Sequence, residues 1–335
     1  MRVNDTLPSV TVLVPTRPGQ ADILAVTAAR QFDYPLERLE ILVARGKQPS
    51  VQRNTGMKAA RGELIYFLDD DSVAPPDNLR RAIAHFQNPA VKIVGGPNLC
   101  PPGAPGLEQV FALVLSSWLA FGPSRARYAR VGEVRESGEK ELILCNLVAR
   151  RGDLLGLGGF NEALYPNEEN ALMDELQKRG GKLIYDPKLF VHRRPRPNLK
   201  SFCRMLMTYG RGRAEQFRVL PTLGSALNFV PPLFLVYLLT LPIVRSLSFG
   251  PGWRQVPGFY SLLLVVYAVV VLGQAVVLMP HGGVARSLAA MPLMVMSHIF
   301  YGIGFWRGLF TPLNAAATRA ATPVELERVW PKDEP

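Results

Sequence analysis

The sequence predicts an α/β domain with a mostly parallel sheet flanked by helices, followed by a C-terminal helical transmembrane region. Two observations support this. Short β-rich runs alternate with segments of helical spacing in the first part of the chain, which is typical of a parallel sheet covered by helices. Beyond Arg218, three long stretches carry no charged residue, and each can cross a hydrocarbon layer of about 30 Å.

The elements of the α/β part follow from local patterns. Apolar, β-branched runs predict strands at residues 10–14, 39–43, 64–68 and 91–94. Helical spacing between them predicts helices at residues 22–31, 51–60 and 79–86. Ser50 can cap the second of these helices, and Gly62 follows its end. In such a sheet, ligands bind beyond the carboxyl ends of the strands.

Three consecutive carboxylates, Asp69, Asp70 and Asp71, directly follow the predicted buried strand 64–68. Adjacent carboxylates raise each other's pKa unless something compensates their repulsion. A hard divalent cation with oxygen ligands is the simplest compensation. The triplet therefore predicts an Mg²⁺ or Mn²⁺ site at a strand end, suited to gripping a diphosphate.

A second constellation lies further along, where the run Gly158-Gly159-Phe160-Asn161-Glu162 precedes Glu168 and Glu169 at the start of a helical segment. Alone, the two glutamates would simply complement a helix dipole. Together with an upstream metal-binding cluster, they indicate a division of labour. One set of acids grips a metal that neutralises a leaving diphosphate, and a separate carboxylate takes a proton from an attacking hydroxyl.

The uncharged stretches predict three membrane spans, at residues 226–246, 257–279 and 287–309, of which the first is interrupted by prolines. The net charge is +11, and most of the surplus precedes Thr222, which places the first part in the cytoplasm by the positive-inside tendency. Three crossings then put the tail, residues 310–335, on the opposite side. Residues 199–219 read as a basic interfacial helix, with a solvated linker as the alternative.

Other classes of protein are disfavoured. The three cysteines are scattered, so neither a zinc site nor a disulfide framework is indicated. A basic chain can bind nucleic acid, but the membrane spans argue against it. The spans lack internal charges, and His298 alone is a thin basis for a transporter. Residues 107–121 fit either a core helix or a helix at the membrane surface.

Taken in order, the motifs resemble those of membrane-associated family 2 glycosyltransferases of the GT-A fold over residues 10–219. The residues that carry the resemblance are Val14-Pro15-Thr16, Gln52-Arg53-Asn54, Phe67 to Asp71, Asn146 ahead of Arg150-Arg151, Gly158 to Glu162, Glu168-Glu169 and Val191-His192. The segment Tyr209 to Ala214 is similar to that of succinoglycan-type exopolysaccharide glycosyltransferases.

The resemblance implies roles. Asp69 and Asp71 match the outer acids of the Asp-x-Asp motif and would bind the metal, with His192 as a further ligand. Glu169 would be the general base and Glu168 would orient the acceptor, although Glu replaces the family's Asp here. The implied nucleotide-sugar-binding residues are Pro15, Thr16, Arg17, Arg45, Arg53, Asn54 and Asp69 to Asp71. The implied acceptor- or phosphate-binding residues are Asn146, Gly158, Gly159, Phe160, Arg211 and Arg213.

One departure concerns the nucleotide. Many relatives carry an acidic pair at the end of the second strand, but Val43-Ala44-Arg45-Gly46-Lys47 has none. Nucleotide recognition is therefore expected to differ, with Arg45 or Lys47 nearer the phosphates. The domain organisation expected is a cytoplasmic GT-A domain, an amphipathic helix, a membrane region and a weakly ordered tail, at residues 1–198, 199–221, 222–312 and 313–335.

The resemblance implies an inverting, Mg²⁺- or Mn²⁺-dependent enzyme at the bacterial inner membrane. It would move a sugar from a nucleotide sugar, most simply a UDP-sugar, to a lipid-linked or growing polysaccharide acceptor. Membrane lipids and polysaccharide-assembly proteins are the expected partners. Two alternatives stay open: a polyprenyl-phosphate glycosyltransferase that makes a lipid-phosphate sugar donor, and a non-catalytic membrane module that binds a nucleotide sugar.

Overall fold

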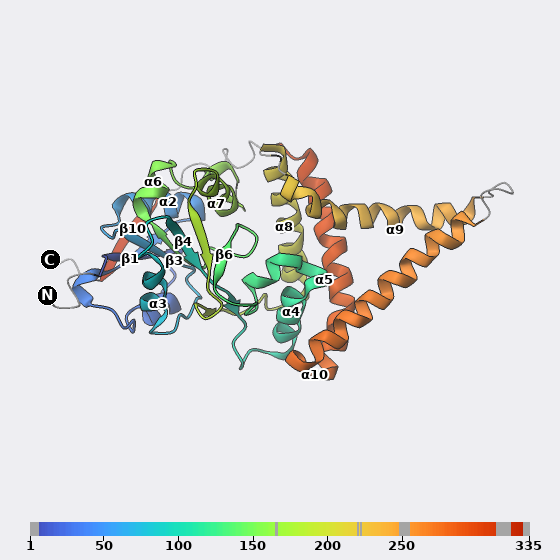
Figure 1. Ribbon diagram of the computed structural model, residues 1–335, viewed down its shortest axis with the longest axis horizontal. Coiled ribbons are helices and arrows are strands. Elements are labelled where there is room, and N and C mark those ends of the chain that lie inside the picture. Colours follow the sequence, from blue (N-terminus) through green and yellow to red (C-terminus); the bar gives the residue numbers. More distant parts are fainter. Residues whose placement is uncertain are drawn as a thin grey trace. The chain divides into compact units, whose positions relative to one another are not determined.

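A computed structural model of the chain describes residues 7–164, 167–219, 221, 223–247, 255–312 and 323–330. The chain divides into two units (Figure 1). The first comprises residues 1–102, 123–194 and 314–335, and the second comprises residues 103–122 and 195–313. The division differs from the expected domain bounds, because residues 103–122 join the helical unit and the final segment returns to the first unit.

The first unit is built on an eight-stranded sheet with the order β10-β2-β1-β3-β7-β4-β8-β6. Its strands are β1 (Val10–Thr16), β2 (Leu39–Arg45), β3 (Leu64–Leu68), β4 (Val91–Gly95), β6 (Arg135–Ser137), β7 (Asn146–Arg150), β8 (Lys182–Tyr185) and β10 (Glu325–Trp330). β1 pairs in parallel with β2 and β3, and β4 pairs in parallel with β8. β7 is antiparallel between β3 and β4. Two short strands, β5 (Asn98–Leu99) and β9 (Val191–His192), pair separately.

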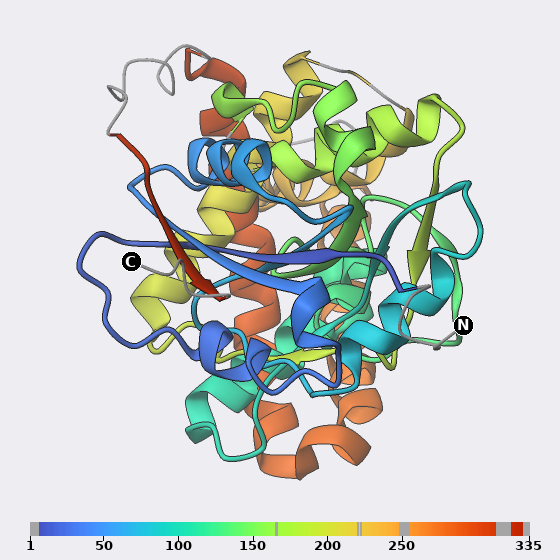
Figure 2. The same ribbon diagram turned by 90° about the vertical axis from the view of Figure 1, so that its left-hand side faces the viewer.

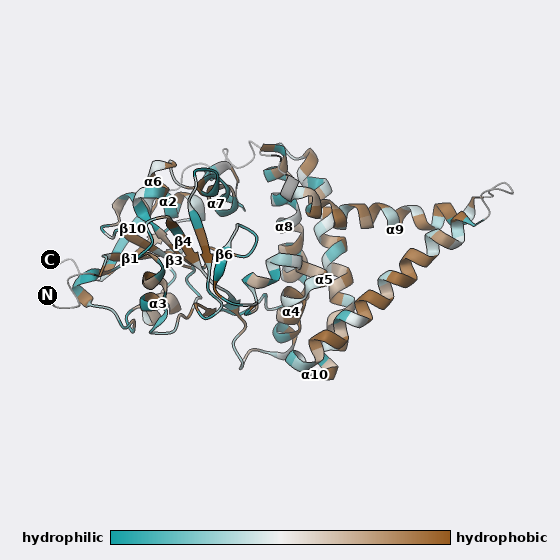
Figure 3. Cartoon of the chain, viewed as in Figure 1, coloured by the Kyte–Doolittle hydropathy of each residue, from teal (hydrophilic) through white to brown (hydrophobic). Residues whose placement is uncertain are grey.

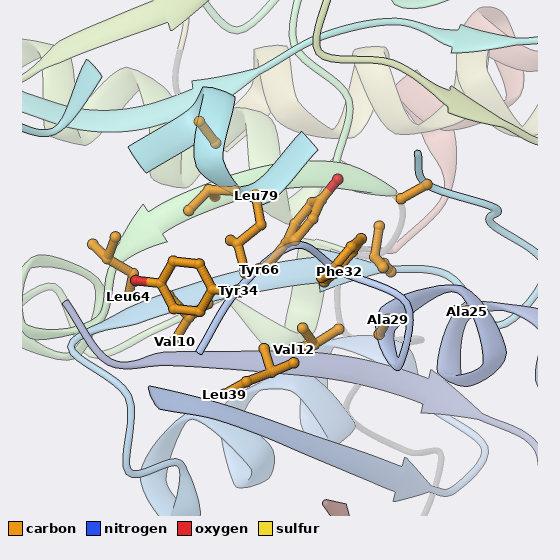
Figure 4. Packing of buried hydrophobic residues seen from close by; sticks show 14 of the residues in the cluster. Val10, Val12, Ala25, Ala29, Phe32, Tyr34, Leu39, Leu64, Tyr66 and Leu79 are labelled. Atoms are coloured by element: carbon orange, nitrogen blue, oxygen red, sulfur yellow. The ribbon is translucent and has the colours of Figure 1, made fainter. Parts of the chain in front are cut away.

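Helices cover both faces of this sheet, as expected for strands that are apolar along their whole length. Alternate residues of one strand belong to different cores: Tyr66 packs in one cluster and Phe67 in the other. Figure 4 shows the first cluster, in which Val10 and Val12 lie with Phe32 and Tyr66. That face is covered by α1 (Leu24–Ala29) and α3 (Asn78–His85), and the opposite face by α2 (Pro49–Ala59), α6 (Arg151–Gly156) and α7 (Glu168–Lys178).

The strand β10 corrects the expectation of a weakly ordered tail. Residues 325–330 pair antiparallel with β2, with Glu327 opposite Val43 (Figure 2). Leu326 packs against the buried core, while Arg328 donates to Glu40 at 2.7 Å. Val329 and Trp330 pack against the other core, so this edge strand contacts both faces of the sheet. The rest of the predicted tail, residues 313–322 and 331–335, lies outside the described residues.

The second unit is helical. It contains α4 (Gly106–Ser116), α5 (Trp118–Phe121), α8 (Leu199–Val219), α9 (Val230–Ser246) and α10 (Val256–Phe310), together with the short 3₁₀ segment η5 (Leu223–Phe229). The stacked rings of Phe111 and Phe202 join α4 to α8, with centroids 4.2 Å apart. The predicted segment 107–121 is therefore a pair of short helices packed within the apolar unit. The described part of the chain also contains the 3₁₀ segments η2 (Leu36–Arg38), η3 (Gly122–Arg127) and η4 (Glu162–Leu164).

Among the described residues, two helices are long and apolar enough to cross a membrane: Ser225–Ser246 and Val256–Phe310 (Figure 3). The second and third predicted spans both lie on α10, which bends at Gly283, a residue with the non-helical angles φ 75° and ψ 168°. Two helices thus stand where three separate spans were expected.

Candidate active site

The aspartate triplet lies where β3 ends, beside the end of β1. The amide of Ser72 donates to the carbonyl of Asp69 at 3.0 Å, which closes a tight turn directly after the strand. The Thr16 hydroxyl donates to the Asp70 carboxylate at 3.1 Å. Asp70 is therefore tied to β1, whereas Asp69 and Asp71 carry the site's ionic contacts.

Two arginines neutralise these aspartates. Arg53 Nη2 lies 2.9 Å from Asp69 Oδ1, and Arg193 Nη1 lies 3.0 Å from Asp69 Oδ2. Arg193 Nε also donates to Asp71 Oδ1 at 2.5 Å. Burial raises the pKa of Asp71 above its ordinary value, and the Arg193 charge only partly opposes this. Both guanidiniums thus supply the positive charge that three adjacent carboxylates require.

Arg193 was not identified from the sequence. It directly follows His192 of β9, and its amide donates to the carbonyl of Leu99 at 3.0 Å. The pairing of β9 with β5 therefore fixes where its side chain begins. An arginine after a two-residue strand has no local signature, and only its position next to His192 could have drawn attention to it.

Arg53 also reaches the second acidic cluster. Its Nη1 lies 3.2 Å from Glu168 Oε1, and Glu168 is 2% exposed at the start of α7. Burial, and then the neighbouring Glu169, raise the pKa of Glu168 to about 7, while Arg53 opposes the rise. Glu169 is only partly buried. The structure thus brings together the two acid clusters that the sequence predicts, with Glu169 the more accessible.

The residues on either side of Arg53 in α2 hold the surrounding loops. Gln52 Nε2 donates to the carbonyls of Thr16 and Ala44, at 2.7 and 2.6 Å, and so ties the ends of β1 and β2 together. Asn54 accepts from the Phe160 amide at 2.8 Å and donates to the Phe160 carbonyl at 2.9 Å. Three consecutive residues of one helix therefore organise three parts of the site.

The segment at Gly158 to Phe160 is shaped by this contact with Asn54. Gly159 has φ 84°, and a Cβ there would lie 2.4 Å from Asn54 Oδ1, so only glycine fits. Phe160 is buried edge-on against Phe67 of β3, with ring centroids 5.5 Å apart. These contacts position the loop against α2 and β3, and the expected binding of acceptor or donor by Gly159, Phe160 and Asn54 stays a prediction.

The predicted metal ligands are assembled only in part. Among the described residues, no group of three or more His, Cys, Asp or Glu side chains is placed to hold a metal ion. His192 is not grouped with Asp69 and Asp71 among these residues; its backbone pairs with Val73, and its role as a further ligand stays a prediction. Two carboxylates still fit Mg²⁺ or Mn²⁺, because such ions are commonly bound by one or two carboxylates plus substrate phosphates.

Other predicted site residues have different surroundings. Asn146 has no exposed surface, and its side chain binds Tyr66 and the carbonyl of Leu189 at 2.8 Å each, so it cannot contact an acceptor as expected. Arg211 pairs with Glu215 on α8, and Arg213 donates to Gln216 on the same helix. Both arginines therefore belong to the second unit, whereas Asp69 belongs to the first.

Arg45, expected near the donor phosphates, ends β2 and is already engaged. Its Nη2 lies 2.9 Å from Glu327 of β10, and its Nη1 donates to the carbonyl of Gln20 at 2.8 Å. An acid therefore does stand at the end of β2, but β10 supplies it. Pro15 lies beside Ala44 in the same parallel pair, and Arg17 is exposed just beyond β1.

Known proteins are similar to this chain in both sequence and fold. Residues 27–109 match the family model described as glycosyl transferase family 2. Succinoglycan biosynthesis protein ExoA of Rhizobium meliloti (strain 1021) is 30% identical over 207 residues, which is 60% of this chain and 56% of that protein. Pre-mycofactocin glycosyltransferase of Mycobacterium tuberculosis (strain ATCC 25618 / H37Rv) is 26% identical over 175 residues, 49% of this chain and 34% of that protein. The matched part of the chain thus spans about half, or less, of these relatives.

A solved structure has the same architecture. Mannosyltransferase PcManGT from Pyrobaculum calidifontis, in complex with GDP-Man and Mn²⁺, superposes with a TM-score of 0.55 at 17% identity, over 86% of this chain and 87% of that one. At this identity the likeness concerns the fold, and it confirms the predicted GT-A architecture.

Proposed function

We propose that the chain is an inverting glycosyltransferase that uses a nucleotide sugar as donor, because residues 27–109 match the model of glycosyl transferase family 2 and a succinoglycan biosynthesis protein is 30% identical. The observation that supports this best is the double contact of Arg53 with Asp69 and Glu168. It joins an acid cluster suited to a diphosphate–metal complex to a second cluster that contains a carboxylate suited to proton abstraction.

In this proposal, Glu169 accepts the proton of the acceptor hydroxyl while the hydroxyl oxygen attacks the anomeric carbon of the donor. The bond between that carbon and the phosphate oxygen breaks, and its electron pair leaves with the nucleoside diphosphate. Attack from the face opposite the leaving group inverts the configuration. Glu168, buried beside Glu169, positions α7 through its contact with Arg53.

The departing diphosphate develops negative charge that the site must offset. Asp69 and Asp71 would hold Mg²⁺ or Mn²⁺, which when bound neutralises part of that charge. Arg53 brings a positive charge to Asp69, and Arg193 brings a second one to both Asp69 and Asp71. These arginines hold the carboxylates in place before the donor arrives, and Arg193 would release its contacts with Asp69 and Asp71 when the metal ion binds them.

We assign the donor to the UDP-sugars and the acceptor to lipid-linked or growing saccharides at the cytoplasmic face of a bacterial inner membrane. The basic helix α8 and the apolar helices after it support an acceptor held at a lipid surface. The likeness to a succinoglycan biosynthesis protein supports a role in making a cell-surface polysaccharide.

The test is release of nucleotide from a panel of nucleotide sugars by the protein in nanodiscs, with Mg²⁺, with Mn²⁺ and with chelator. Glu169→Gln and Asp71→Asn should each abolish turnover while the protein stays folded. Glu175→Gln is the matched control, because Glu175 lies on the same helix and forms an exposed pair with Arg179. Retained turnover in both site variants, or equal rates with chelator, would contradict the proposal.

A further inference from the structure

The strand β10 constrains the path of the chain through the membrane. Its residues come after the helical region, yet they pair with β2 from Ile41 to Arg45. Two ion pairs reinforce this pairing, Arg328 with Glu40 at 2.7 Å and Arg45 with Glu327 at 2.9 Å. Neighbouring strands of one sheet share a compartment, so the region between residues 195 and 324 must cross a membrane an even number of times.

We propose that the chain crosses the membrane twice, as a hairpin made of α9 and residues 256–282, and that residues 284–310 lie at the membrane surface on the side of the sheet. The lipid bilayer is thus the partner of the hairpin, while β10 returns to close the sheet. This topology does not depend on the proposed enzymatic activity. The sequence predicted three crossings and therefore a tail on the far side. The proposed topology has two crossings and a tail on the side of the sheet.

The hairpin has the surface and length that a bilayer requires. Large apolar side chains along both helices face outward, among them Leu239 at 65% exposed and Val277 at 62%. Counted from Ser225 in η5 to the end of α9, the first arm of the hairpin has 22 residues, and it and residues 256–282 each exceed the roughly 20 residues needed to cross a hydrocarbon layer. The two helices are joined by polar contacts from Tyr237 and Thr240 to Tyr260, at 2.8 and 2.6 Å. Figure 3 shows that brown, the hydrophobic colour, predominates along both.

Residues 284–310 are equally apolar but differ in what they touch. Two of their glycines pack closely against the backbone of α8: a Cβ on Gly304 would lie 2.0 Å from the Met207 carbonyl oxygen, and one on Gly308 would lie 2.4 Å from that of Arg211. Such small-residue contacts are typical of tightly joined helices in membranes. Arg218 adds a bond to the carbonyl of Gly308 at 3.1 Å. The two helices therefore form one rigid pair.

The charges on α8 decide where this pair lies. α8 carries basic residues along its length, at Lys200, Arg204, Arg211, Arg213 and Arg218. If residues 284–310 crossed the bilayer, α8 would be carried into the hydrocarbon with its charges, each of which is costly at that depth. A basic amphipathic helix is instead stable in the plane of the headgroups. Residues 284–310 then lie there too, with one side against α8.

The bend at Gly283 separates the crossing and surface parts of α10, and polar contacts hold it. The amide of Leu119 in α5 donates to Gln274 at 3.1 Å, and its carbonyl contacts His298 Nε2 at 2.9 Å. Tyr267 contacts the other ring nitrogen of His298 at 2.8 Å. Residues on both sides of Gly283 are thus joined through α5. His298, which lies in the predicted third span, therefore helps to hold the two parts of α10 together through its contacts with Leu119 and Tyr267.

Cysteine labelling tests the topology in the full chain. In a variant whose three native cysteines are replaced, Ser246→Cys, Arg286→Cys and Pro323→Cys are introduced singly; Pro323 is exposed and lies just before β10. Spheroplasts are treated with a membrane-impermeant maleimide before and after permeabilisation. Ser246→Cys should label fully in intact spheroplasts. Arg286→Cys and Pro323→Cys should label at least tenfold more after permeabilisation, since the proposal places both on the sheet's side.

Each other result overturns the proposal. Labelling of Pro323→Cys in intact spheroplasts would mean an odd number of crossings, and protection of Ser246→Cys would mean that the hairpin does not cross. A fluorescent protein fused after Pro335 gives an independent readout if the cysteine-free chain misfolds, because it matures only in the cytoplasm and should fluoresce. Since neither readout uses turnover, the topology can fail while the enzymatic proposal stands, and the reverse.

Discussion

Asp69 and Glu168 share one guanidinium: the terminal nitrogens of Arg53 lie 2.9 Å from Asp69 Oδ1 and 3.2 Å from Glu168 Oε1. The strand end that carries the proposed metal ligands and the helix that carries the proposed base are therefore fixed to each other by one side chain. Arg53 is itself buried in α2, so any shift of that helix would move both acids together.

Loss of Arg53 should destabilise the fold. Arg53→Met leaves buried Glu168 without its counter-charge, and breaking a buried pair costs about 3–5 kcal/mol. The double variant Arg53→Met/Glu168→Gln should cost less than the sum of the single changes, because no unpaired charge remains at Glu168. Urea unfolding of the detergent-solubilised protein measures this. Arg80→Met, which removes an exposed pair with Asp33, should change the free energy of unfolding by less than about 0.5 kcal/mol.

The raised pKa of Glu168 predicts a pH dependence of stability. Below about 4.5 the carboxyl is protonated in the folded and unfolded chains alike. Between that pH and about 7, the folded protein holds a proton that the unfolded chain has released, so stability falls as pH rises through this window. The fall is on the order of 3 kcal/mol. Glu168→Gln should flatten the profile, whereas Glu175→Gln should keep it; equal slopes in all three proteins would contradict the assignment.

Arg193 and a divalent ion should compete for the same carboxylates. Removing its charge in Arg193→Gln should tighten binding of Mn²⁺ by about tenfold, or about 1.4 kcal/mol. Calorimetric titration with Mn²⁺ alone, without nucleotide, measures this directly. Arg196→Gln removes an exposed charge three residues away and should leave the affinity unchanged. Weaker binding in Arg193→Gln would show that the guanidinium assists the metal.

Gly158 and Gly159 form a matched pair for the loop beside Asn54. Both have positive φ, but a Cβ on Gly158 meets nothing within 4 Å, whereas one on Gly159 meets Asn54. Gly158→Ala should therefore cost only the backbone strain, about 1–2 kcal/mol. Gly159→Ala should cost more and also slow turnover, because the loop must move away from α2. Thermal unfolding and nucleotide release measure the two effects, and equal behaviour of the variants would argue against the Asn54 contact.

Gly304 and Gly273 make the corresponding comparison on α10. Gly304→Val forces a side chain into the backbone of α8 and should destabilise the helical unit by about 3 kcal/mol or more. Gly273→Val meets nothing within 4 Å and should be tolerated. Thermal unfolding of fluorescent fusions in detergent separates them. If Gly304→Val is as stable as Gly273→Val, the tight packing of α8 on residues 301–308 is wrong.

Local patterns were enough to predict β1, β2, β3, β4 and both acid clusters, but not β7, which lies antiparallel between β3 and β4. The strands at residues 10–14 and 64–68 are continuous apolar runs, and the acids directly follow or begin an element. Asn54 and Arg53 were found through their motif, but only the fold shows that Asn54 holds the Gly159 loop while Arg53 bridges two clusters. Arg193 escaped notice because its partners are distant in sequence and its strand is two residues long.

In the membrane region, too, local sequence patterns do not show which segments pack against each other. Hydropathy registers residues 256–282 and 284–310 as equivalent, because both are apolar along their length. What separates them is packing: the glycines at 304 and 308 have partners on α8, and those at 258 and 273 have none within 4 Å. A short strand such as β10 is likewise invisible locally, since its register is set by a contact 282 residues away.

The position of β10 at the outer edge of the sheet also orders events during biosynthesis. The ribosome makes β2 early, but the strand that covers its open side emerges only after the hydrophobic helices. The unpaired edge of β2 is therefore exposed in the nascent chain until the membrane helices have been inserted. A product truncated before Glu325 would keep this unpaired, aggregation-prone edge. The sheet of the first unit can therefore be completed only after the hydrophobic helices have been inserted into the membrane.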